Sequence, residues 1–170
     1  MRIIKTPSVL KASFPNYVWN IKTDEKILYL TFDDGPTPKI TTEVLNILGR
    51  FEAKATFFCI GKNVEKHPEI YSRIRNEGHI VGNHTYDHLK GWLHPTTRYV
   101  ENTQKAATLI ESKLFRPPYG RIKPSQTKAL KALGYTLVMW DVLSYDWEKK
   151  ISKEQVLQNT IGKTKSGSII

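Results

Sequence analysis

The stretch Ile27-Leu28-Tyr29-Leu30-Thr31-Phe32-Asp33-Asp34-Gly35-Pro36 decides how the rest of the chain is interpreted. It is an apolar run of strand length that ends in two carboxylates and a Gly-Pro pair, which is typical of a turn. Successive strand residues point to opposite faces, so Asp33 and Asp34 diverge unless the turn redirects one of them. A turn rich in Asp and Gly explains Asp34-Gly35-Pro36 alone, but not the strand that leads into two carboxylates.

Other apolar runs alternate with segments of helical periodicity. The expected strands are Ile27–Phe32, Ala55–Ile60, His79–Gly82, a short one before Arg116, Tyr135–Trp140 and Ser168–Ile170. The expected helices include Lys39–Phe51, Tyr99–Leu114 and one that begins at the capping box Ser152-Lys153-Glu154-Gln155. Gly78, Gly134 and Gly167 each follow a helical segment and precede a strand, where a left-handed cap is needed. This alternation predicts an α/β fold with a parallel sheet, either an open doubly wound sheet or an irregular barrel.

Composition indicates an ordinary globular protein of one domain. The chain has 170 residues, 39% of them hydrophobic and 25% charged. No apolar run approaches the ~20 residues of a membrane-spanning helix, and no apolar core of an export signal follows the basic N-terminus. We therefore expect no integral membrane segment and, from these residues alone, a cytoplasmic location. The single cysteine, Cys59, lies in an apolar run and is expected to be a buried thiol.

The net charge of +10, from 26 Lys and Arg against 16 Asp and Glu, favours anionic partners. The basic residues are scattered, so solvated helix surfaces explain much of this charge. A nucleic-acid-binding protein is disfavoured, because several aspartates at the expected ligand-binding edge would repel phosphates. An acidic polymer of the cell envelope is the mildly favoured partner, and the sequence indicates no oligomeric state.

The polar motifs all follow the carboxyl ends of expected strands. Asp33 and Asp34 end the first strand, His84 and His88 follow the third, Arg116–Tyr119 follow the fourth, and Asp141–Trp147 follow the fifth. In parallel α/β folds these ends meet along one edge, where ligands bind. The sequence therefore predicts that residues far apart in the chain converge there.

His84 and His88 are four residues apart, so a helical turn would set both imidazoles on one face. Two histidines with the carboxylate of Asp34 form a donor set that leaves positions open for water and substrate. Zinc suits this set best, and cobalt, nickel, manganese and iron fit the same donors. A hydrogen-bonded histidine pair near a turn is the alternative interpretation.

In this order, three motifs resemble those of the polysaccharide deacetylases, also called carbohydrate esterase family 4 or the NodB homology domain. They are Thr31-Phe32-Asp33-Asp34-Gly35, His84-Thr85-Tyr86-Asp87-His88 and Arg116-Pro117-Pro118-Tyr119-Gly120. The resemblance implies a distorted parallel (β/α) barrel formed by residues 27–170, with residues 1–26 as an N-terminal extension packing on it. It also implies metal-dependent removal of N-acetyl groups from a polysaccharide that contains N-acetylglucosamine, whether peptidoglycan, chitin oligomer or exopolysaccharide. The family usually acts at the cell envelope or outside the cell.

The resemblance also implies a role for each site residue. Asp33 is the expected catalytic base, Asp34, His84 and His88 are the expected metal ligands, and Arg116 is expected to pair with Asp33. The backbone N–H of Tyr119 is expected to stabilise the oxyanion. Asp146 and Trp147 match a fourth motif, Asp-x-x-Asp-Trp, in which this chain has Leu143 at the first aspartate. Pro118, Tyr145 and Trp147 are expected to line the sugar site, although core packing explains the aromatic residues equally well.

The family's catalytic acid is a histidine in a Leu-x-His-type motif on the next strand. This sequence ends at Ile170, where that strand begins, and none of its histidines occupies the position. We therefore expect the last part of the domain to be absent, and the chain to bind metal but to deacetylate poorly. A non-catalytic carbohydrate-binding protein on the same scaffold is the alternative function.

Overall fold

The computed structural model describes residues 2–170. The chain forms two compact units: one contains the residues up to Leu30 together with Val138–Ile170, and the other is Thr31–Leu137. The sequence had placed residues 27–170 in one domain, and that domain boundary stays a prediction. None of the helices in the described part is long and apolar enough to cross a membrane.

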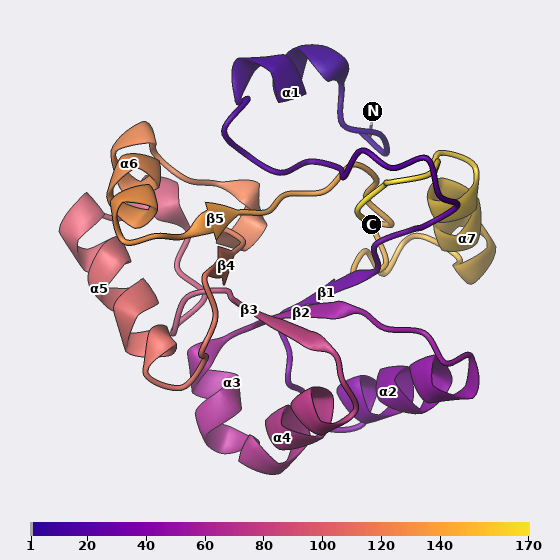
Figure 1. Ribbon diagram of the computed structural model, residues 1–170, viewed down its shortest axis with the longest axis horizontal. Helices are drawn as coiled ribbons and strands as arrows, with labels where there is room; N and C mark the ends of the chain where they lie inside the picture. The colour runs from indigo at the N-terminus through magenta and orange to yellow at the C-terminus, as the bar shows by residue number, and fades with distance from the viewer. Residues whose placement is uncertain (1) are drawn as a thin grey trace. The chain divides into compact units, whose positions relative to one another are not determined.

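The unit Thr31–Leu137 is built on one parallel sheet with the strands in chain order (Figure 1). The strands are β1 (Thr31–Asp33), β2 (Thr56–Cys59), β3 (Ile80–Asn83), β4 (Leu114–Phe115) and β5 (Thr136–Leu137). Every recorded pairing between neighbours is parallel. The prediction of an α/β fold with a parallel sheet and crossover helices is therefore confirmed.

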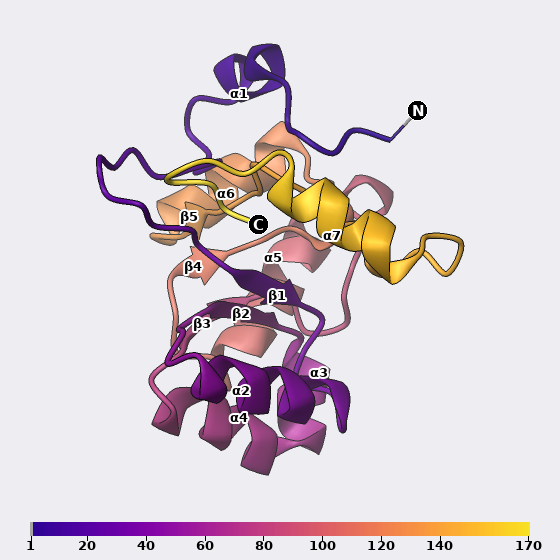
Figure 2. The ribbon, with the colours of Figure 1, turned by 90° about the vertical axis from the view of Figure 1, so that its right-hand side faces the viewer.

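Helices of this unit lie between the strands in sequence. They are α2 (Ile40–Arg50), α3 (Gly61–Lys66), α4 (Pro68–Asn76), α5 (Thr96–Ala107) and α6 (Pro124–Ala132). Figures 1 and 2 show α2, α3 and α4 together on one side of β1–β3, while α5 and α6 pack against each other.

Several predicted boundaries were wrong. The strand expected over Tyr135–Trp140 is limited to β5, and the strand expected over Ser168–Ile170 is replaced by isolated bridges at Ser168 and Ile169. The helix expected over Tyr99–Leu114 ends at Ala107, because Leu114 pairs with Thr136 in the sheet instead of continuing the helical face. The strand expected over Ile27–Phe32 is shorter and shifted to β1, since the residues before it bridge to the other end of the chain at Tyr29 and Ile169.

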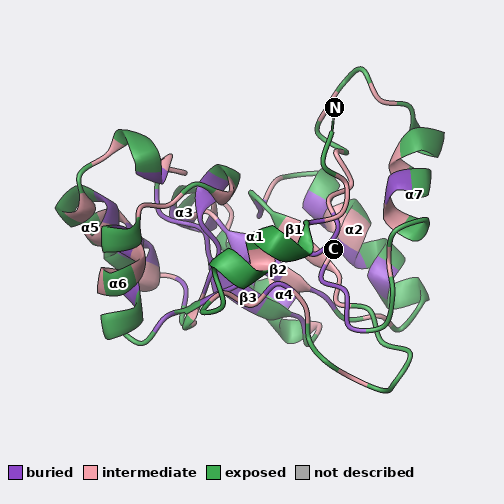
Figure 3. Cartoon of the chain, turned by 90° about the horizontal axis from the view of Figure 1, so that it is seen from above, coloured by how far each residue is buried: buried purple, intermediate pink, exposed green. Residues whose placement is uncertain are grey.

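Large side chains fill the core of this unit. Phe58, Tyr99 and Phe115 are fully buried, and the rings of Tyr99 and Phe115 meet edge to face at 6.1 Å. Gly82 is required beside Phe58, because a Cβ there would lie 2.4 Å from the Phe58 ring. Exposed residues lie along the outer turns of α5 and α6 (Figure 3).

The other unit holds α1 (Ser8–Ser13) and α7 (Lys153–Ile161). The predicted capping box of α7 is confirmed at Ser152, whose Oγ accepts a hydrogen bond of 3.2 Å from Gln155 N, whereas the Gln155 side chain donates to Asn159 Oδ1. The carboxylate of Asp141 is fully buried in this unit and binds Lys5 Nζ (2.6 Å), Lys11 Nζ and Ser168 Oγ (2.6 Å).

Candidate metal centre

Three strand ends position the site. Asp33 is the last residue of β1, His84 follows β3, and Arg116 follows β4. Because these strands are parallel, their carboxyl ends lie at one edge of the sheet. The residues that the sequence predicted to converge from these strands are close together in the structure.

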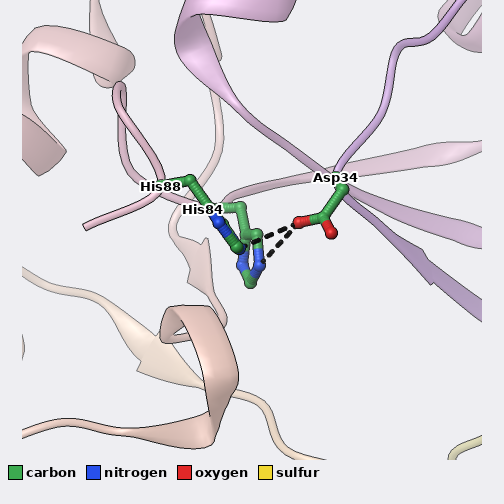
Figure 4. A group of neighbouring side chains, drawn as sticks. All are labelled: Asp34, His84 and His88. Atoms are coloured by element: carbon green, nitrogen blue, oxygen red, sulfur yellow. Dashed lines mark ion pairs between the residues drawn. The ribbon is translucent and has the colours of Figure 1, made fainter. Parts of the chain in front are cut away.

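Asp34, His84 and His88 form a compact group of potential metal ligands (Figure 4). The Oδ1 atom of Asp34 lies 3.0 Å from His88 Nε2 and 3.4 Å from His84 Nε2. One donor atom from each residue lies within 4.8 Å of the others. Two imidazole nitrogens and one carboxylate oxygen are a donor set that suits zinc and related divalent ions.

A hydrogen bond with the backbone orients the His84 imidazole as a potential metal ligand. Its Nδ1 lies 2.7 Å from the carbonyl oxygen of Arg116, and the imidazole is 2% exposed. When Nδ1–H donates to that carbonyl, the lone pair of Nε2 is directed at Asp34 and is available to a metal ion. The residues therefore fit a divalent cation.

The helical turn predicted for His84–His88 was wrong, because this segment is an irregular loop. Thr85 and His88 adopt left-handed backbone conformations, with φ of 63° and 56°. The side chain of Asn83 accepts a hydrogen bond from Thr85 N, and that of Asn102 accepts from the next two backbone N–H groups. These amides, rather than helical hydrogen bonds, bring both imidazoles to one side.

Asp34 is redirected by the turn that follows β1, as expected. Its φ is 66°, and Asn63 Nδ2 donates a hydrogen bond of 2.8 Å to its carbonyl oxygen. Burial alone would raise the pKa of the Asp34 carboxyl, but hydrogen bonds and charges from His84 and His88 outweigh burial and hold that pKa well below its ordinary value. Asp34 is thus a carboxylate aimed at two imidazoles.

Asp33 faces a buried arginine. Arg116 Nη1 donates hydrogen bonds to Asp33 Oδ1 (2.9 Å) and to Thr31 Oγ1 (2.7 Å). The guanidinium lies 4.2 Å from the centre of the Phe58 ring and its side chain is 3% exposed, against 31% for Asp33. Burial lowers the pKa of Arg116 below its ordinary value despite the opposing charge of Asp33. The carboxylate of Asp33 is therefore fixed in position while part of it remains accessible.

Pro118 and Tyr119 lie in the short helix η2 (Pro118–Gly120). Tyr119 has a φ of 60°, and its ring packs on the His88 ring with the centroids 4.6 Å apart. Pro118 is buried, whereas Tyr119 is 58% exposed. The tyrosine is thus the accessible part of this turn.

The remaining predicted residues, Asp146, Tyr145 and Trp147, belong to the other unit. The rings of Tyr145 and Trp147 lie 5.1 Å apart, and the Tyr145 hydroxyl accepts a hydrogen bond from Ile3 N. Asp146 accepts a hydrogen bond of 2.5 Å from Ser144 Oγ. The roles predicted for Asp146, Tyr145 and Trp147 stay predictions.

Sequence reasoning did not find the amide side chains that shape the site, Asn63, Asn83 and Asn102. Single amides inside or beside helices and strands have no periodicity that distinguishes them. The one available signal was the position of Asn83, directly after the strand expected over His79–Gly82 and directly before His84.

Residues 20–138 match the model of the family described as polysaccharide deacetylase. The chain is 38% identical over 147 residues to a peptidoglycan-N-acetylglucosamine deacetylase of Bacillus cereus, covering 83% of this chain and 53% of that protein. It is 34% identical over 158 residues to chitin deacetylase 2 of Saccharomyces cerevisiae, covering 81% of this chain and 46% of that protein. The chain thus spans about half the length of these two relatives.

Solved structures show the same fold. A peptidoglycan N-acetylglucosamine deacetylase superposes with a TM-score of 0.83 at 35% identity, over 91% of this chain and 75% of that one. A family 4 carbohydrate esterase from Streptomyces lividans has a TM-score of 0.76 at 31% identity, over 86% and 78% of the two chains. A family pseudoenzyme from Bacillus anthracis, 24% identical with a TM-score of 0.78 over 89% of this chain and 56% of that one, shares the fold alone.

Proposed function

Because the chain belongs to the polysaccharide deacetylase family, we propose that it is a metal-dependent hydrolase that removes N-acetyl groups from N-acetylglucosamine-containing polysaccharide. The observation that carries the proposal is the juxtaposition of two carboxylates at the end of β1, one facing two imidazoles and the other facing a buried arginine. A shared fold does not suffice for this activity, as the pseudoenzyme relative illustrates.

Asp34, His84 and His88 would hold one divalent cation. Zinc suits these donor atoms best, and cobalt, nickel, manganese and iron fit the same donors. When bound, such a cation supplies Lewis acidity, which polarises a carbonyl oxygen and makes a water molecule more acidic. The three residues supply the charge and the donor geometry that keep the cation at the accessible edge of the sheet.

Asp33 is the proposed general base. Arg116 engages its Oδ1 atom, which leaves Oδ2 to accept a proton from water, and the carboxylate is exposed enough for water to reach it. Holding the carboxylate in one position avoids its reorganisation at the moment of proton transfer. Arg116 is therefore a positioning residue for Asp33.

The turn at Pro118–Gly120 is proposed to complete the site. Its left-handed conformation at Tyr119 fixes the direction of the backbone N–H that we propose as a donor to the oxyanion. The exposed Tyr119 ring offers an apolar face to a sugar, and Pro118 supports it. The roles that the family resemblance implies for Asp146, Tyr145 and Trp147 remain part of the proposal.

Acetate release from an N-acetylglucosamine oligomer, with and without added zinc, tests this function. We expect slow, metal-dependent release, and this release should fall by at least about a hundredfold in Asp33→Asn. Asp24→Asn, an exposed aspartate outside the site, is the matched control and should behave as wild type. Oligomer binding without any acetate release would favour the carbohydrate-binding alternative over the hydrolase.

A further inference from the structure

Two loops beside the metal cluster run against each other. Gly91 N donates a hydrogen bond of 3.1 Å to the Arg121 carbonyl oxygen. A Cβ at Gly91 would lie only 2.6 Å from that oxygen, so glycine permits this close approach. The loop that continues from His88 and the loop that continues from Tyr119 therefore form one surface.

The fully buried side chain of Gln126 ties these loops together. Its Nε2 donates hydrogen bonds to the carbonyl oxygens of Gly91 (2.9 Å) and His94 (3.1 Å). Its Oε1 accepts one from Lys123 N at 2.9 Å. A buried amide with three partners holds the backbone on both sides of the surface in a fixed arrangement.

The surface presents a rigid aromatic ring and an arginine. Trp92, in the short helix η1 (Gly91–Leu93), is 54% exposed, yet its Nε1 donates a hydrogen bond of 3.2 Å to the Ile122 carbonyl oxygen. The Arg121 guanidinium lies 4.5 Å from the centre of the Trp92 ring. An exposed indole that is already held in place binds a ligand with little loss of side-chain entropy.

This surface is continuous with the metal cluster. The ring of Tyr119 contacts the His88 ring at 4.6 Å and has Lys90 Nζ 5.8 Å from its centre. Between Lys90 and Arg121 the two loops share the backbone hydrogen bond at Gly91. A glycan with one sugar at the cluster can therefore extend over Tyr119 towards Trp92.

The charge of the surface is positive and uncompensated. Lys90, Arg121 and Lys123 all lie on these two loops, and none of them takes part in the ion pairs recorded for residues 2–170. A guanidinium on an aromatic ring keeps its outer N–H groups free to bind a carboxylate through two parallel hydrogen bonds.

We propose that Trp92 and Arg121 form a subsite for a carboxylate-bearing sugar residue of the glycan whose neighbouring N-acetyl sugar occupies the metal cluster. The pyranose ring packs on the indole and the carboxylate binds the guanidinium. The inference rests on the proposed function and deepens it, because it selects an acidic N-acetylated glycan over a neutral one.

The test compares two soluble oligosaccharides of equal length by calorimetric titration at low salt. One contains only N-acetylglucosamine, and the other alternates it with N-acetylmuramic acid, whose lactyl group carries a carboxylate. We expect wild type to bind the acidic oligomer about fivefold more tightly, and Arg121→Gln to abolish this preference. Arg121→Lys should retain only part of it, because an ammonium lacks the bidentate fork.

Arg98→Gln is the matched control, since Arg98 is an exposed arginine of α5 outside the two loops. It should keep the full preference, whereas Trp92→Ala should weaken binding of both oligomers. Equal affinity of wild type for the two oligomers would overturn the subsite, as would equal losses in Arg98→Gln and Arg121→Gln.

Acetate release measured in the same samples separates the two proposals. A preference that depends on Arg121 without acetate release from either oligomer would leave the subsite standing and remove the hydrolase. Acetate release without any preference for the acidic oligomer would support the hydrolase and rule out the subsite.

Discussion

Replacement of Arg116 by methionine perturbs the candidate site without touching a predicted metal ligand. The guanidinium side chain is 3% exposed, and it is the charged partner of the Asp33 carboxylate, which is 31% exposed. Removing one member of a buried ion pair costs about 3–5 kcal/mol, because the other charge is left in a medium of low polarity. Since Asp33 keeps some contact with water, we expect Arg116→Met to lose about 3 kcal/mol of unfolding free energy.

Urea unfolding of metal-free protein measures this loss. The double variant Asp33→Asn/Arg116→Met has neither charge. Its loss of unfolding free energy should therefore be about 2 kcal/mol smaller than the sum of the losses in the two single variants. Arg73→Met is the control, because Arg73 and Glu77 also form a close pair (2.5 Å) but are each about one-third exposed, and its loss should stay below about 1 kcal/mol. An Arg116→Met loss as small as that of the control, or additive effects in the double variant, would show that Asp33 and Arg116 are not a strongly coupled buried pair.

Three other outcomes follow from buried groups. Burial acts to raise the pKa of Asp141, but hydrogen bonds from Lys11, Lys5 and Ser168 outweigh burial, and the pKa is lowered. The carboxylate therefore stabilises the folded protein at pH values above its unfolded-state pKa of about 3.9. This stabilisation is lost as the pH falls towards the folded-state pKa. Asp141→Asn should therefore cost about 3 kcal/mol in urea unfolding at pH 7, with a difference from wild type that shrinks below pH 4. Burial, and to a smaller extent the charge of Asp33, raises the pKa of the Cys59 thiol to about 12. Iodoacetamide should therefore label this buried thiol at pH 8 only in denaturant, and fast labelling of native protein would contradict the prediction. Gly91→Ala should separate the loops and destabilise the protein by at least about 1 kcal/mol, against little change for Gly49→Ala, where a Cβ meets nothing within 4 Å.

The sequence predicted buried strands well where the apolar run was continuous. Ala55–Ile60 was expected and β2 covers Thr56–Cys59, because a short run of buried apolar residues between polar segments has few alternatives. Leu114 was misassigned to a helix because its spacing from Ile110 suits either structure, and only its pairing with Thr136 distinguishes them. The helical segment expected before Gly134 is confirmed as α6, although its start was not assigned from Pro124, which stands at its first turn.

The sequence predicted the residues of the candidate site better than their geometry. Strand ends explain why Asp33, His84 and Arg116 converge, since parallel strands share one edge. The left-handed conformations of Thr85 and His88 were not predictable, because no glycine marks them and distant amides such as Asn102 stabilise them. For the same reason the surface at Trp92 and Arg121 was not found, as it depends on the buried contacts of Gln126.

Calorimetric titration of metal-stripped protein with zinc measures whether Asp34, His84 and His88 bind a metal ion. We predict one-to-one binding in wild type that is lost in His84→Ala and retained in His67→Ala, a histidine beside Glu69 that lies outside the ligand cluster. Absence of binding in wild type, or equal binding in His84→Ala, would show that Asp34, His84 and His88 do not form a metal site.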